Sequence, residues 1–254
     1  MRSGFPKLGF WRAIILTALW LAGCAKPVPQ LTPMPTPTPV VISLPPALAP
    51  LTQAVVACQS ALPDLALFVV VQSQAEPDAD LSIAYNPDAS EANIYQIGWD
   101  QLLPVYSDSG QNFSLSLEDL KQRYLYTDQA ESVVNRDLMA WTYPDGDIMR
   151  LLFEEVLFVT SRISQEIYVA PDPESMAQAL AKMDNPSVGY LPAAWKTDKL
   201  KEIRLPPAIK SMLRLPILVK IARPSWPAGQ MLIACLQSGV GQDIIRKTYL
   251  PISP

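Results

Sequence analysis

Residues 41–71 read VISLPPALAPLTQAVVACQSALPDLALFVVV, and this stretch decides the fold class. It opens with a β-branched run and closes with residues 65–71, a continuous apolar run that is typical of a parallel strand buried on both faces. Between the two runs, prolines of the kind tolerated at a helix start precede the apolar stretch 47–62, which predicts a helix. The order strand, tight turn, helix, strand is the repeating unit of an α/β protein.

The same alternation continues towards the C-terminus. Ser116 and Asp119 have the spacing of an N-terminal capping box and predict a helix through Tyr124. The long strand expected over 94–106 contains Asp100 and Pro104, where we expect it to be interrupted. Strands alternating with helices predict α/β layers and parallel sheets. Further strands are predicted at 81–85, 139–143, 167–170, 188–191 and 216–222, and further helices at 148–158, 172–183, 229–235 and 242–249.

The N-terminal residues have the order of a secretory signal. A positively charged start, containing Arg2 and Arg12, precedes the apolar run 13–22 and the sequence Leu21-Ala22-Gly23-Cys24. The apolar run is short for a membrane span, which needs about 20 residues. An ordinary signal peptide with a chance cysteine, or an uncleaved membrane helix, is the alternative. The Pro/Thr-rich residues after Cys24 predict an extended, semi-rigid tether. We therefore divide the chain into a leader (1–23), Cys24 with its tether (24–38) and a folded domain (39–254).

Composition removes several classes of function. The chain contains no histidine, which excludes Ser-His-Asp and Cys-His catalysis and the commonest zinc ligand. It also lacks a phosphate-binding glycine loop, so we expect neither an enzyme nor a cofactor. Between Pro27 and Leu120 ten acidic residues occur without a lysine or arginine. An acidic first half argues against a nucleic-acid partner, although acidity that merely keeps the protein soluble explains it as well.

One of the three cysteines, Cys24, lies in the N-terminal segment, and the other two lie in the folded domain. If Cys24 is lipidated, Cys58 and Cys235 remain, each on an apolar helical stretch at opposite ends of the domain. Two remaining cysteines of an exported protein are able to form a disulfide, which we expect here. Two buried free thiols are the alternative.

Five stretches, taken in order, resemble one known superfamily. They are 41–71, IGWDQLLPVYSDSGQNFSLSLEDLKQRYL (97–125), WTYPDGDIMRLLF (141–153), PESMAQALAKMDNPSVGYLPAAW (173–195) and LPILVKIARPSWPAGQ (215–230). Their order and spacing resemble the type 2 periplasmic-binding-protein superfamily, most closely its phosphate-binding branch, over residues 39–254. The ending Leu21-Ala22-Gly23-Cys24 likewise resembles the bacterial lipoprotein lipobox, which implies cleavage before Cys24 and lipidation of that residue.

The resemblance implies an α/β fold of two lobes with a ligand cleft between them. Lobe one would comprise 39–100 and 217–254, and lobe two 104–215, so that both remaining cysteines fall in lobe one. Binding in such a fold proceeds by hinge closure around a solute. The implied ligand-facing positions are Ser43 and Leu44 at the first turn, with an ordinary serine helix cap as the alternative.

The turn Asp145-Gly146-Asp147 departs from the family. It stands where relatives have Ser-Gly-Thr, so two hydroxyl donors have become carboxylates, and the neighbouring arginine position corresponds to Trp141. Two carboxylates would repel phosphate in a dry cleft, which disfavours phosphate as the ligand. Aromatic walls suit a small organic or cationic solute instead, although packing alone is the alternative reading of each residue. The remaining cleft candidates are Tyr85, Asn86, Asp100, Tyr143 and Tyr190.

Two functions follow from this reading. In the first, the protein is a monomeric, lipid-anchored binding protein on the extracytoplasmic side of the membrane, delivering a small solute to an ABC-type permease. In the second, the cleft has degenerated and the protein is a surface module for protein interactions. A pair of carboxylates at Asp145 and Asp147 is weak support for an enzyme, because nothing else catalytic lies beside them in sequence.

Overall fold

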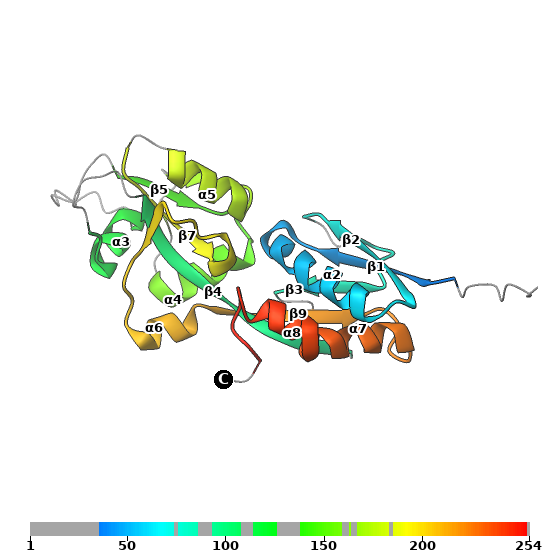
Figure 1. The fold of residues 1–254 in the computed structure, drawn as a ribbon. Coiled ribbons are helices and arrows are strands. Elements are labelled where there is room, and N and C mark those ends of the chain that lie inside the picture. Colours follow the sequence, from blue (N-terminus) through cyan, green and yellow to red (C-terminus); the bar gives the residue numbers. More distant parts are fainter. Residues whose placement is uncertain are drawn as a thin grey trace, which may run out of the picture. The chain divides into compact units, whose positions relative to one another are not determined.

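Two groups of strands share one long strand, β4 (Ile94–Ser107), in the computed structural model (Figure 1). The structure describes residues 36–73, 76–85, 93–107, 114–125, 138–158, 163, 167–182 and 185–252. The leader, Cys24, the tether up to residue 35 and Asn86 lie outside these ranges, so the predictions made for them remain predictions. Among the described residues, no helix is both long enough and apolar enough to cross a membrane.

The strand order is β2-β1-β3-β9-β4-β7-β5-β6, with β8 also paired to β4. Strands β1 (Thr38–Leu44), β2 (Leu65–Val71) and β3 (Leu81–Ala84) are parallel, as are β5 (Met139–Thr142), β6 (Tyr168–Val169) and β7 (Ser187–Pro192). Strands β4, β8 (Leu200–Glu202) and β9 (Arg214–Ile221) run antiparallel to their neighbours. The sheet is therefore mixed: parallel pairs are present in both parts as predicted, and the antiparallel pairing of β4, β8 and β9 was not predicted.

Strand β4 changes partner in its middle. Its residues 94–101 pair with β9, and its residues 102–107 pair with β7 and β8. We call β1, β2, β3, β9 and the first half of β4 the first strand group, and β5 to β8 with the second half of β4 the second strand group. The expected interruption at Asp100 and Pro104 was wrong, because β4 is continuous there; its register shift lies between Gln96 and Gly98.

The predicted helices are present, with shifted ends. Pro46–Leu51 form the 3-10 helix η2, which continues as α2 (Thr52–Ala61). The capping box at Ser116 and Asp119 is confirmed at the start of α3 (Leu117–Tyr124). Three short elements were not predicted: β8, η3 (Ala193–Trp195) and α6 (Pro207–Met212). The other helices are α4 (Ile148–Phe158), α5 (Pro173–Lys182), α7 (Pro227–Gln237) and α8 (Gly239–Ile245).

Strand β2 is not buried on both faces as its apolar run predicts. It is the last strand of the first group, and Phe68 and Val71 are 55% and 44% exposed. Its inner neighbour β1 carries the burial instead, with Val40, Ile42 and Leu44 in the core. An uninterrupted apolar run therefore identified a strand correctly but not its place in the sheet.

A disulfide joins Cys58 on α2 to Cys235 on α7, which confirms the predicted pairing. The two residues are 177 positions apart in sequence, and their Cα atoms are 5.9 Å apart. Gly241 of α8 lies against the bridge, where an added Cβ would meet the Cys58 sulfur at 2.6 Å and the Cys235 carbonyl oxygen at 2.5 Å. The bridge therefore fixes the packing of α2, α7 and α8 as one unit.

We expect removal of this bridge to destabilise the protein. A crosslink that closes a long loop restricts the unfolded chain, and its loss typically costs about 2–5 kcal/mol. In denaturant unfolding, Cys58→Ser/Cys235→Ser should lose about this much free energy of unfolding, whereas Cys24→Ser, which leaves the bridge intact, should not. Equal stability of the two variants would contradict this role of the bridge.

Candidate functional site

The predicted ligand-facing residues occupy strand ends where the two strand groups meet. Ser43 and Leu44 are the last residues of β1, and Tyr85 directly follows β3. Asp100 lies on β4 next to the point where this strand changes partner, and Tyr143 directly follows β5. The carboxyl ends of parallel strands are the usual position of ligand sites in α/β folds.

Ser43 contributes to this region through its strand and not as a helix cap. The N-cap residue of η2 is Pro45, which makes no side-chain capping bond, so the alternative reading of Ser43 as a cap was wrong. The Ser43 hydroxyl oxygen accepts a hydrogen bond from the Glu76 N–H at 3.1 Å. A hydroxyl is both donor and acceptor, so Ser43 is also able to donate a hydrogen bond.

Asp100 is the centre of a buried hydrogen-bond network. Its Oδ2 accepts from the Tyr85 hydroxyl at 2.8 Å. Its Oδ1 accepts from the N–H of Gln101 at 2.8 Å and from the N–H of Ala193 at 3.2 Å. These donors come from the end of β3, from β4 and from η3, so one carboxylate links three segments at the junction of the strand groups.

The Asp100 carboxyl group is fully buried, and this burial raises its pKa to about 6 despite the three hydrogen bonds. Tyr85 responds in the same direction, since burial and the charge of Asp100 hold the pKa of its phenol well above the usual value. Tyr85 is therefore a permanent donor to Asp100. Because Tyr85 and Asp100 are hydrogen-bonded to each other, their role is to hold the structure around the candidate site.

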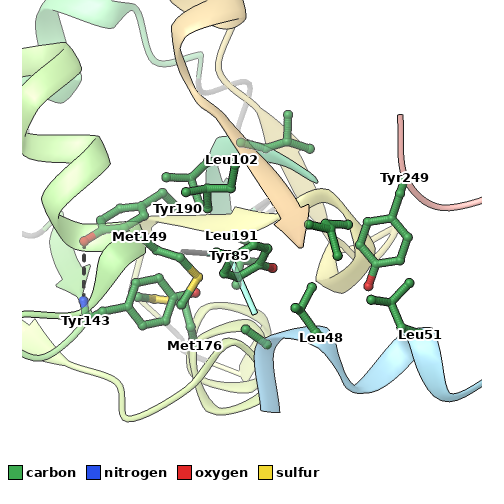
Figure 2. Packing of buried hydrophobic residues seen from close by; sticks show 14 of the residues in the cluster. Leu48, Leu51, Tyr85, Leu102, Tyr143, Met149, Met176, Tyr190, Leu191 and Tyr249 are labelled. Atoms are coloured by element: carbon green, nitrogen blue, oxygen red, sulfur yellow. Dashed lines mark hydrogen bonds between the residues drawn. The ribbon is translucent and has the colours of Figure 1, made fainter. Parts of the chain in front are cut away.

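A further hydrogen bond, between η3 and η2, lies close to this network in sequence. The indole N–H of Trp195 on η3 donates to the Ala47 carbonyl oxygen of η2 at 2.7 Å, and α5 packs against η2. Apolar side chains from both groups fill the space between; Figure 2 shows Leu48, Tyr85, Tyr143, Met149, Met176 and Leu191 in this buried cluster.

Tyr143 is a buried residue of this cluster whose polar group lacks a partner among the described residues, as does that of Tyr249. Its side chain is fully buried, and its hydroxyl has no hydrogen-bond partner among the described residues. The ring is held by Tyr190, whose ring packs edge-on at 5.2 Å and whose hydroxyl accepts from the Tyr143 N–H at 3.4 Å. Tyr190 is in turn fixed by stacking on Phe153 at 3.8 Å and by Thr142 at 2.7 Å.

Two nearby carboxylates cap the N-terminal ends of α4 and α5. Asp147 accepts through Oδ1 from the N–H groups of Met149 at 2.8 Å and Arg150 at 3.4 Å, at the start of α4. Asp172 accepts from the Ser175 N–H at 2.7 Å at the start of α5. Burial raises the pKa of the Tyr143 phenol, and the charges of Asp147 and Asp172 are among the further causes. The unpartnered hydroxyl therefore lies in a negative environment.

The two aspartates of the Asp145-Gly146-Asp147 turn have different surroundings. Gly146 has a φ of +82°, which a glycine adopts without strain. The Asp145 side chain is 91% exposed and pairs with Arg150 at 2.6 Å, whereas Asp147 is half-buried, and burial raises the pKa of its carboxyl group. One carboxylate is paired with Arg150 and the other caps α4, so these contacts give no support to paired acid–base catalysis.

Arg150 is a residue beside the candidate site that sequence reasoning missed. Its guanidinium binds Asp145, Glu154 at 2.7 Å and the Tyr143 carbonyl oxygen at 3.2 Å. The spacing of Arg150 and Glu154, four residues apart on one helix, was the available signal. These three partners engage its Nε and Nη1 atoms, so Arg150 ties the turn to the start of α4.

Asp100 should make stability depend on pH. Because its pKa of about 6 exceeds the value of about 3.9 for an unfolded chain, the folded state retains a proton that the unfolded state loses between these pH values. The free energy of unfolding should therefore fall by up to about 1.4 kcal/mol per pH unit as the pH rises from about 4 to about 6, and level off above.

Asp100→Asn removes this titration and retains an acceptor for Gln101 and Ala193. Urea unfolding of both proteins between pH 4 and pH 7 should show that the difference in stability, wild type minus variant, declines over that range. A difference that stays constant with pH would contradict the assignment.

Comparison with known proteins supports the fold. No protein-family model matches the sequence, and no curated protein sequence is significantly similar to it. Many solved structures match the fold, and three of them have 14–17% identity to this chain. A putative phosphate ABC transporter substrate-binding protein from Clostridium perfringens, solved with bound phosphate, has a TM-score of 0.67 and 17% identity, covering 84% of this chain and 99% of that one.

An ABC-type phosphate transport receptor from Vibrio cholerae has a TM-score of 0.58 and 16% identity, covering 84% of this chain and 100% of that one. A mutant of OxyR from Corynebacterium glutamicum has a TM-score of 0.57 and 14% identity, covering 94% and 72%. The chain therefore has the two-lobed fold of type 2 periplasmic binding proteins, as the sequence resemblance implied. At this identity the likeness establishes the fold and not the ligand.

Proposed function

We propose that this protein is a lipid-anchored, extracytoplasmic solute-binding protein that delivers an uncharged or cationic organic solute to an ABC-type permease. The observation that carries the proposal is the unpartnered Tyr143 hydroxyl, buried at the junction of the strand groups in a fold whose ligands bind between two lobes. Two structural neighbours are substrate-binding or transport-receptor proteins by name, which supports the role. The exported location is supported by the leader and Leu21-Ala22-Gly23-Cys24.

We infer the class of solute from the carboxylates that already bind the N–H groups at two helix starts. The N–H groups at a helix start bind anions readily, and here the carboxylates of Asp147 and Asp172 take them. Arg150 is likewise occupied by carboxylates. An incoming phosphate would have to displace these groups and would meet their negative charge. A cation or a neutral molecule would instead gain from the carboxylates, the Tyr143 hydroxyl and the tyrosine faces.

We expect solute binding to raise thermal stability, since a ligand that binds only the folded state stabilises it. In a panel of cationic, zwitterionic, neutral and anionic solutes, members of the cationic or neutral classes should raise the melting temperature. Phosphate and molybdate should not. Stabilisation by phosphate alone would contradict the proposed solute class, and stabilisation by no solute would contradict the function.

Two conservative variants separate binding from folding. Tyr143→Phe removes a hydroxyl that has no protein partner, so its stability should equal or exceed that of the wild type. Its affinity for the solute found above should fall about 10-fold by calorimetry, as expected for one lost hydrogen bond. Asp147→Asn retains a helix-capping oxygen but loses the charge, and should weaken a cationic solute selectively. Asp243→Asn on the exposed face of α8 is the matched control and should change neither property.

Attachment to the membrane is tested separately. Cys24→Ser removes the acceptor of the lipid, so the variant should move from the membrane fraction to the soluble fraction, and the wild-type N-terminal peptide should carry the mass of acyl chains. An unmodified Cys24 in the membrane fraction would contradict the lipoprotein reading.

A second function, a surface module for protein interactions, is supported by the burial of the predicted cleft residues. Ser43, Leu44, Tyr85, Asp100 and Tyr143 are all buried by one another and their neighbours, as expected if the former cleft is now packed core. In that case the protein is a surface module for protein interactions. Co-purification of a stable protein partner that tolerates Tyr143→Phe and Asp147→Asn, together with a solute screen without hits, would favour this function.

A further inference from the structure

The two edge strands of the sheet differ in length and protection. At one edge, β6 has only two residues, whereas β2 at the other edge has seven and reads LALFVVV. Natural edge strands are kept from further pairing by shortness, a charge, a proline or a bulge. Strand β2 has none of these features, and its register with β1 is unbroken. Among the described residues, no strand pairs with its outer side (Figure 1).

Two hydrogen bonds show which backbone groups of β2 face this open edge. The Gln72 N–H donates to the Leu44 carbonyl oxygen, and the Thr38 N–H donates to the Asp64 carbonyl oxygen. Backbone groups point to alternate sides along a strand, so the even-numbered residues of β2 bond to β1. The N–H and carbonyl groups of the odd-numbered residues from 67 to 71 are therefore directed away from β1, towards the open edge.

Phe68 projects from the middle of this edge strand. Leu67 and Val69 pack against the core, so Phe68, between them, points to the opposite face of the sheet. Its side chain is 55% exposed, and that of Val71 is 44% exposed. Exposed apolar side chains beside backbone groups that lack a neighbouring strand mark this edge as a surface for association.

We propose that β2 pairs with β2 of a second copy of this chain, antiparallel and about a two-fold axis that passes between the two Phe68 residues. The sheet then continues from one copy into the other. In this register Leu67 of each copy exchanges backbone hydrogen bonds with Val69 of the other, and Phe68 faces Phe68 at a position between those pairs. This dimer replaces the monomer expected from the sequence.

The charges at the ends of β2 fit a second copy. With Phe68 opposite Phe68, Asp64 of one copy lies opposite Gln72 of the other, so a carboxylate meets an amide and no like charges oppose each other along the strands. A membrane surface fits less well, because ten acidic residues and no lysine or arginine occur between Pro27 and Leu120.

The segment that precedes β1 also fits this arrangement. Thr38 at the start of β1 lies beside Leu65 at the start of β2. The two-fold axis places the β1 starts of the two copies about 23 Å apart along the strand direction, for seven residues at about 3.3 Å each. Residues 25–37 would span up to about 40 Å when extended, so both lipid anchors would reach one membrane.

Confinement of both copies to one membrane raises their effective concentration, which favours a contact as small as one strand pair. This advantage rests on the lipid anchor proposed above, whereas the strand pairing itself does not depend on the anchor or on solute binding.

Cysteine cross-linking of the full-length protein in membranes tests the register. Phe68→Cys should form a disulfide-linked dimer on mild oxidation, because opposed Cα atoms at such a position are about 4.5 Å apart, within the disulfide range. Ala66→Cys alone and Val70→Cys alone should not, since each residue is offset from its own copy by about 13 Å. Produced together, these two variants should form the mixed dimer, which shows that both cysteines react.

Non-reducing gels read out the result. Absence of a cross-linked dimer in Phe68→Cys, equal cross-linking of all three single variants, or cross-linking of Phe68→Cys only to a different protein would overturn the proposal.

A charge exchange tests the two-fold axis without cysteines. Phe68→Lys should abolish co-purification of two differently tagged copies and leave the melting temperature unchanged, because the position is exposed. Phe68→Lys and Phe68→Glu produced together should associate more strongly than either variant with itself, because opposite charges then face each other. Val169→Lys, exposed on β6, is the control and should associate as the wild type does. Self-association that persists in Phe68→Lys, or a mixture no better than its components, would contradict the dimer.

Discussion

The buried carboxylate of Asp100 is the constraint on which the junction depends. It lies next to the point where β4 leaves β9 for β7, and it is satisfied by neutral donors from Tyr85, Gln101 and Ala193. A charge buried at this point would be costly without these donors, and its pKa of about 6 shows that part of the cost remains. The donors orient η3, which then presents Trp195 to η2. The candidate site is arranged around this junction.

In the proposed function, charge decides which solutes the junction accepts. N–H groups at a helix start favour anions, and in this chain the carboxylates of Asp147 and Asp172 accept from those at the starts of α4 and α5. Arg150 neutralises the exposed side of the turn through Asp145 and Glu154. In the proposed function, the solute would meet the Tyr143 hydroxyl, tyrosine faces and the methionines of the buried cluster. This arrangement differs from a phosphate site in its electrostatics while retaining the backbone fold.

Much of the fold follows from local sequence signals. The runs of β-branched residues located β1, β2 and β9 to within two residues, and the Ser116 capping box gave the start of α3. The cysteine count gave the disulfide, because only two cysteines remain once Cys24 is assigned to a lipid. Strand position was not predictable in this way: the run 65–71 belongs to an edge strand because long-range pairing, not composition, sets the order of a sheet.

The short elements η3 and α6 lack any periodic pattern and owe their form to contacts with distant segments, such as those of Gln101 with the Lys210 and Leu213 carbonyl oxygens.

The sequence predicted which residues lie at the candidate site, but not what each side chain contacts there. Tyr85, Asp100 and Tyr143 lie at the junction where strand ends predicted them, but whether a side chain faces a ligand or another side chain depends on tertiary geometry. Asp100 thus emerged as a support, Asp147 as a helix cap and Arg150 as an unpredicted partner of the turn.

Native mass spectrometry of the protein, purified without added ligand, tests the central claim most directly. The account predicts that a single small organic molecule, neutral or cationic, co-purifies with the wild type and is reduced or absent in Asp147→Asn or Tyr143→Phe. Bound phosphate, or a protein without any small molecule in both wild type and variants, would contradict it.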